Sequence, residues 1–133
     1  RLFISHAWKY GDDYNRLISL LNNAPYFNYY NYSAPKEKPL FPYGTPMTNS
    51  KIRELISNKI RPSQITIVFA GMYAAYSDWI KYEIDESVRM NKPILAIQPW
   101  GQQRFPSYVT QNADKIVGWN TSSIVSAIRE LAR

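Results

Sequence analysis

A tryptophan and a glutamate, Trp79 and Glu83, stand four residues apart in the segment Ser77–Ile84. In a helix this spacing puts both side chains on one face, one turn apart. A carboxylate beside a large ring is placed like the carboxylates with which glycosidases stabilise positive charge at a sugar carbon. Glu83 is therefore our candidate catalytic residue, and Glu86, three positions further on, is the competing carboxylate on a neighbouring face.

Each of these candidates also has a purely structural interpretation. Glu83 could be a solvated helix residue paired with Lys81 or Ser87, and Trp79 could serve only in packing. His6, the single histidine, follows an apolar run, where it could line a pocket or act as a general base.

Strands and helices alternate around these residues. Apolar runs at 2–4, 65–70 and 94–97 do not alternate with polar residues, so they predict strands buried on both faces. Weaker strands are predicted at 27–32, which is aromatic and rich in asparagine, and at 115–118. Polar residues able to cap helices precede four amphipathic stretches, the third of which is predicted to run from Trp79 to about Met90; these capping positions are 12–13, 48–50, 77–78 and 120–122.

This order predicts an α/β fold of flavodoxin-like type, with a doubly wound five-stranded parallel sheet and helices on both faces. Residues 1–133 are interpreted as a single domain. Two loops are predicted, a proline-rich one at 34–46 and another at 98–109. Ligands of such sheets bind where the strands end, which here is after Ile4 and near the beginning of the helix that carries Glu83.

The amino-acid composition excludes several kinds of site and partner. The chain has 133 residues, no cysteine, one histidine and a net charge of +6. We therefore expect no metal site, and the lack of cysteine is compatible with a cytoplasmic protein. No apolar run is long enough to span a membrane. The basic residues are scattered and do not form a block, which argues against nucleic acid as the partner.

Several relatives of this architecture can be excluded by their motifs. A response-regulator receiver needs an aspartate at the end of its third strand, where this chain has Gly71. A flavodoxin needs a hydroxyl- and glycine-rich phosphate loop after its first strand, and residues 6–11 do not provide one. The GxGxxG dinucleotide fingerprint, the P-loop and the GxSxG nucleophile elbow are all absent.

The remaining pattern resembles a known family. Phe3-Ile4-Ser5 resembles the opening strand of Toll/interleukin-1 receptor (TIR) domains, and Ser77-x-Trp79-x-x-x-Glu83-Ile84 resembles their third-helix motif. The proline-rich loop at 34–46 stands where the family has a variable loop after its second strand. The segment Trp79–Ile84 is most similar to the TIR-like branch of bacterial Thoeris antiphage systems.

The resemblance implies an enzyme that breaks the bond between nicotinamide and ribose in NAD. NAD would be the substrate, no cofactor would be needed, and Glu83 would be the catalytic carboxylate. The products would be ADP-ribose, a cyclic form of it or a conjugate, serving as a signal in antiphage defence. It also implies self-association through TIR–TIR contacts and a phage-derived trigger. The residues expected to bind the substrate are Ser5, His6, Ala7, Trp8, Asp13, Phe41 and Trp79.

Two other functions stay open at this point. Many TIR domains are interaction modules without chemistry, and the long loop at 34–46 is consistent with such a role. A nucleotide-binding domain of another flavodoxin-like lineage is the third interpretation.

Overall fold

The computed structural model describes residues 2–4, 12–30, 50–69, 73–98 and 107–132. Within these ranges the elements follow in the order β1 (Leu2–Ile4), α1 (Asp12–Asn23), α2 (Ser50–Ile60), β2 (Ile65–Phe69), α3 (Tyr73–Arg89), β3 (Ile94–Gln98), α4 (Ser107–Asn112), β4 (Lys115–Gly118) and α5 (Thr121–Leu131).

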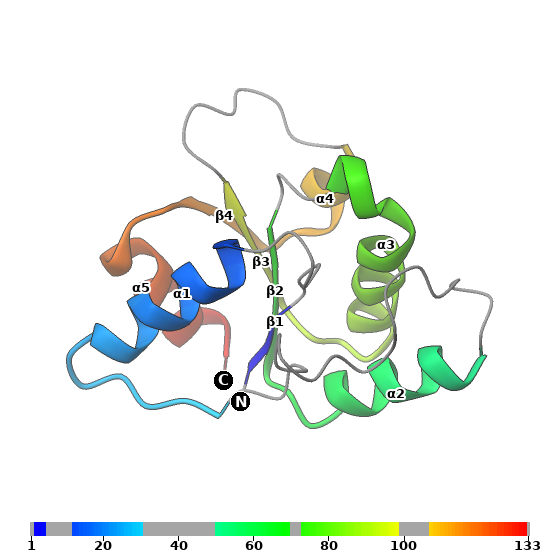
Figure 1. Ribbon diagram of the computed structural model, residues 1–133, viewed down its shortest axis with the longest axis horizontal. Coiled ribbons are helices and arrows are strands. Elements are labelled where there is room, and N and C mark those ends of the chain that lie inside the picture. The colour runs from blue at the N-terminus through cyan, green and yellow to red at the C-terminus, as the bar shows by residue number, and fades with distance from the viewer. Residues whose placement is uncertain (1, 5–11, 31–49, 70–72, 99–106, 133) are drawn as a thin grey trace.

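The described strands form one parallel sheet in the order β1-β2-β3-β4. Parallel neighbours need crossover connections, and the helices supply them. Figure 1 shows α1 and α5 on one side of the sheet and α2, α3 and α4 on the other. The predicted α/β class, with a parallel sheet and helices on both faces, is therefore confirmed.

The core divides into two layers, one on each face of the sheet. Odd-numbered residues of β2 and β3, such as Ile67 and Leu95, pack against α1 and α5. Even-numbered residues, such as Val68 and Ala96, pack against α3 and α4, and Phe3 of β1 packs against α2. Because both faces are covered, β2 is buried along its whole length, which explains its unbroken apolar sequence.

The fifth strand of the prediction is not found. Its described part, residues 27–30, is not a strand, and residues 31–32 lie outside the described residues. One backbone hydrogen bond does connect this segment to the sheet, from Leu2 N to Tyr30 O at 2.7 Å. The segment thus runs beside β1, at the edge where the flavodoxin-like order would place a second strand. Asparagine is depleted in strands, and Asn28 stands between the aromatic residues of this segment.

Two helix predictions need correction. Helix α3 begins at Tyr73, so Ser77 and Asp78 lie inside it and are not its caps; Ala74 and Ala75, which favour helix, extend it towards β2. Helix α4 occupies part of the stretch predicted as a loop at 98–109. It is only six residues long and buries Val109 alone, so it leaves too little periodicity to be recognised.

Other predicted boundaries are confirmed. Asn120 caps α5, its side chain accepting a hydrogen bond from Ser123 N at 3.0 Å. Helix α3 ends at Arg89, and Asn91, two residues further on, has a positive φ of 57°. The amide of Asn91 donates to Val88 O and that of Lys92 to Ser87 O, the paired bonds of a Schellman motif.

The difference between central and edge strands gives a stability prediction. Ile67→Ala should lower the free energy of unfolding by about 2–5 kcal/mol, because it leaves a cavity in a fully buried site. Ile116→Ala removes the same atoms from β4, where the side chain is 38% exposed, and should cost well under half as much. Urea denaturation of the two variants measures both values, and equal losses would contradict the layered core described above.

Candidate active site

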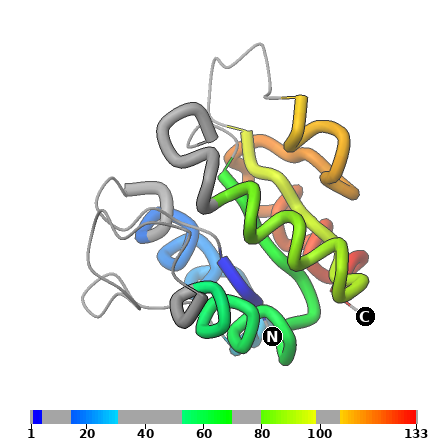
Figure 2. Tube along the Cα trace, turned by 90° about the vertical axis from the view of Figure 1, so that its right-hand side faces the viewer, coloured from blue at the N-terminus to red at the C-terminus, as the bar shows by residue number. Residues whose placement is uncertain are grey.

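Helix α3 carries Glu83, the candidate catalytic residue, and begins at the edge where β2 ends. The helix presents three stripes to its surroundings. Ile80 and Ile84 face the sheet in an apolar cluster, while Tyr82 faces α2. With 3.6 residues per turn, Glu83 falls on the stripe between those two sets. Figure 2, which looks onto this side of the molecule, shows α2 and α3 lying next to each other.

Glu83 is buried, with an exposed fraction of only 8%. The interpretation of Glu83 as a solvated surface residue is therefore wrong. Lys81 Nζ lies 5.2 Å from the ring centroid of Tyr108, and Ser87 Oγ donates to the backbone carbonyl of Glu83 at 2.7 Å. A carboxylate in a water-poor environment interacts more strongly with a nearby positive charge than it does in water. The burial of Glu83 is therefore consistent with its predicted role.

Glu86, the competing carboxylate, has a structural environment. Its carboxylate accepts hydrogen bonds from Arg89 Nε at 2.9 Å and Arg89 Nη2 at 2.8 Å. Ser57 Oγ of α2 donates to Glu86 Oε2 at 2.7 Å, and Tyr82 OH lies 2.7 Å from the same Ser57 oxygen. The hydrogen bond from Arg89 lowers the pKa of Glu86 below its ordinary value, against burial, which raises it, with a further lowering by Ser57.

This polar cluster, formed by Ser57, Tyr82, Glu86 and Arg89, joins α2 to α3. Tyr82 OH also contacts the backbone carbonyl of Arg53 at 3.1 Å. An ionised Glu86 can only accept, so the Ser57 hydroxyl must donate to it. The single proton of Tyr82 OH is then shared between Ser57 Oγ and the Arg53 carbonyl. The cluster therefore explains Glu86 as a residue that fixes the two helices together.

The remaining predicted substrate-binding residues cannot be placed. Ser5, His6, Ala7, Trp8 and Phe41 lie outside the described residues. Asp13 and Trp79 belong to α1 and α3, respectively, but their side chains lie outside the described part of the structure. Their participation in the site stays a prediction.

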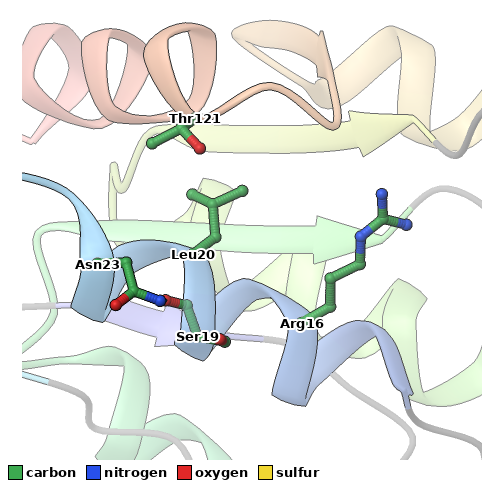
Figure 3. Close-up of a pocket in the computed structure, with 5 residues that line it drawn as sticks. All are labelled: Arg16, Ser19, Leu20, Asn23 and Thr121. Atoms are coloured by element: carbon green, nitrogen blue, oxygen red, sulfur yellow. The ribbon is translucent and has the colours of Figure 1, made fainter.

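A second feature lies at the same edge on the opposite face of the sheet. Trp119 follows β4 and stacks on Phe69, with the two ring centroids 5.9 Å apart. The guanidinium of Arg16 lies over the Trp119 ring, 4.4 Å from its centroid, in a cation–π contact. Trp119 is thus a core residue. Arg16 also lines a pocket of about 380 Å³, whose lining residues are shown in Figure 3. It lies between α1 and α5 and is lined by Arg16, Ser19, Leu20, Asn23 and Thr121.

Two general features of the described residues bear on the site. Among them, no group of three or more histidine, aspartate or glutamate side chains is arranged to hold a metal ion. None of the described helices combines the length and apolar character that a membrane span requires.

The parallel α/β fold and the position of Glu83 on the helix that joins β2 to β3 agree with a TIR-like domain. Because α3 begins at Tyr73, Glu83 lies in the second half of this helix and not, as predicted from the sequence, near its beginning. The model of the family described as Thoeris protein ThsB, TIR-like domain, matches residues 3–104, well over half of the chain. The chain therefore belongs to this family. A search of curated proteins finds no relative of it. The matched region contains Trp79, Glu83 and the predicted substrate-binding residues.

Sequence reasoning did not foresee the polar contacts of α3. Ser87 Oγ lies 2.7 Å from Thr66 Oγ1 of β2, inside an otherwise apolar layer. The available signals were a lone threonine within the apolar run Ile65–Phe69 and a serine one helical turn after Glu83.

The charge of Glu86 predicts a pH-dependent stability. Because the folded pKa is lowered, the stabilisation is complete above the ordinary pKa of a glutamate, about 4.3, and is lost as the pH falls through the lower folded pKa. Glu86→Gln should cost about 1 kcal/mol at pH 7 and much less at pH 3, measured by urea denaturation. Glu54→Gln, an exposed glutamate of α2, is the control and should cost little at either pH. A loss for Glu86→Gln that does not change with pH would contradict this assignment.

Proposed function

We propose that this protein cleaves NAD at the bond between nicotinamide and ribose, with Glu83 as the essential carboxylate. The observation that carries the proposal is the burial of Glu83 on α3, at the third-helix motif position of a family member. Two other carboxylates of α3 do not combine these features: Glu86 is only partly buried, Asp85 is exposed, and neither stands at the motif position.

In this reaction the main task of the protein is to stabilise the positive charge that develops on the ribose. The C–N bond between the ribose and nicotinamide breaks, its electron pair leaves with neutral nicotinamide, and positive charge develops on the ribose carbon. A carboxylate in a water-poor site stabilises that charge and can hold the ribose hydroxyls. Water attack gives ADP-ribose and a proton, whereas attack by the substrate's own adenine gives a cyclic product. NAD is the substrate, and the proposal requires no cofactor.

The proposed biological role is production of a nucleotide signal in antiphage defence, as the Thoeris family name suggests. We place this reaction in the cytoplasm, where phage components are present during infection. A phage-derived trigger would start the reaction, and TIR–TIR self-association would complete the site. The substrate-binding group of the proposal is Ser5, His6, Ala7, Trp8, Asp13, Phe41 and Trp79.

The proposal predicts that Glu83→Gln abolishes NAD cleavage. The substitution keeps the size of the side chain and removes its charge, so turnover should fall on the order of 100-fold or more. The measurement is mass spectrometry of the nucleotides after incubation of the intact protein with NAD at high protein concentration. Glu86→Gln is the matched control on the same helix and should keep turnover within about threefold of the wild type, an allowance on the scale of a 0.7 kcal/mol change in barrier.

The outcomes separate the candidate functions. Nicotinamide release that disappears only in Glu83→Gln supports the proposal, and the mass of the second product identifies the attacking group. Equal turnover by wild type and Glu83→Gln would keep an enzyme but remove Glu83 from its centre. No turnover by the wild type, even with its trigger present, would favour the non-catalytic interaction module.

A further inference from the structure

Two hydroxyl side chains meet inside the apolar layer between α3 and the sheet. Thr66 of β2 and Ser87 of α3 are both fully buried, with exposed fractions of 0%. Their oxygens are 2.7 Å apart. The neighbouring inward-facing residues of β2 and α3, Val68 and Ile84, are apolar. The pair is therefore a directional contact within an interface that is otherwise held by non-directional hydrophobic packing.

The pair extends to the candidate catalytic residue. Ser87 Oγ is also 2.7 Å from the backbone carbonyl oxygen of Glu83. A serine hydroxyl has one proton, and a carbonyl oxygen can only accept. Ser87 is the donor toward both acceptors, so its single proton is shared between Thr66 Oγ1 and Glu83 O. The hydrogen bonds then form one chain, which begins on the central strand β2 and ends on the main chain of residue 83.

This series of hydrogen bonds fixes both the rotation of α3 about its axis and its position along β2. Sliding the helix along β2, or turning it by one residue, would separate the two hydroxyl groups. Thr66 would then be a buried hydroxyl without this partner, which is unfavourable, whereas Ser87 would keep only its bond to Glu83 O on its own helix. Packing of Ile80 and Ile84 alone gives no such penalty, because apolar side chains tolerate small shifts.

We propose that Thr66 and Ser87 are positioning residues for Glu83, holding its main chain at one place relative to β2. In its catalytic consequence this inference rests on the proposed NAD cleavage. The placement of residue 83 is a separate, structural consequence and can be tested without turnover.

Another buried serine of the protein, Ser63, provides a close control for Ser87. Ser63 is also buried, with an exposed fraction of 1%, and its hydroxyl donates to the carbonyl four residues earlier, Lys59 O, at 2.9 Å. Ser63→Ala therefore removes a hydrogen bond of the same kind at a site that follows α2 and is not on α3. Ser87→Ala and Thr66→Val are the two test variants, and Thr66→Ser, which keeps a hydroxyl, is the rescue variant.

The first measurement is steady-state NAD cleavage by the folded variants. Ser87→Ala and Thr66→Val should lower kcat on the order of 10-fold with little change in KM, because misplacing a catalytic group affects the chemical step. Ser63→Ala and Thr66→Ser should stay within about twofold of the wild type, a change in barrier of only ~0.4 kcal/mol. Losses of kcat in Ser87→Ala and Thr66→Val no larger than in Ser63→Ala would overturn the proposal.

The second measurement does not depend on activity. The carboxyl ¹³C chemical shift of Glu83, assigned with the Glu83→Gln variant, is compared at one pH for all the proteins. Ser87→Ala and Thr66→Val should move this resonance, whereas Ser63→Ala and Thr66→Ser should leave it in place. An unmoved resonance in both test variants would overturn the proposal. If the wild type does not cleave NAD, the proposed function fails, and this measurement alone decides whether Thr66 and Ser87 place residue 83.

Discussion

Parallel pairing of β2 with β3 is the constraint on which the rest of the molecule depends. Parallel strands cannot be joined by tight turns, so each is followed by a crossover, and each face of the sheet must be covered. The register that pairs Thr66 with Ile94 and Phe69 with Ile97 sends both strands to one edge. The helix that follows β2 must therefore begin at that edge and run back across the sheet. Glu83 is buried beside the strands because it lies on this returning helix.

Helix α3 packs against both the sheet and α2, and the contacts on the two sides differ. Against the sheet it uses apolar side chains and one pair of hydroxyl groups. Against α2 it uses Tyr82, with Met90 directly after the helix, in an apolar cluster, together with the hydrogen bond that Glu86 accepts from Ser57. The apolar contacts supply most of the affinity between the layers, while the polar contacts select one orientation. Glu83 lies between the two kinds of contact, where its surroundings are fixed from two directions.

The sequence predicted the parallel sheet because its buried strands are unbroken apolar runs, and it predicted the end of α3 and the beginning of α5 from Asn91 and Asn120. It did not predict α4, whose single buried residue leaves no pattern, or the early beginning of α3 at Tyr73. For the site, the spacing of Trp79 and Glu83 predicted that both residues lie on one helix, and both belong to α3; the role of Glu83 stays a prediction. The burial of Glu83 and the partners of Ser87 could not be predicted, because both depend on which side of α3 meets the sheet. The match to a family model over residues 3–104 shows the family, which the spacing of two residues alone could not show.

The pairing of β3 with β4 has a consequence for where this chain can be divided. The family match ends at residue 104, yet Leu95 to Gln98 of β3 pair with Lys115 to Gly118 of β4. Helix α5 adds Ile124, Val125 and Ile128 to the same core layer as Ile67. A fragment cut at the end of the matched region would have an open sheet edge and a bare apolar face, both of which favour aggregation. The unit that folds therefore extends beyond the matched residues, because β4 completes the pairing of β3 and α5 contributes buried side chains to the core.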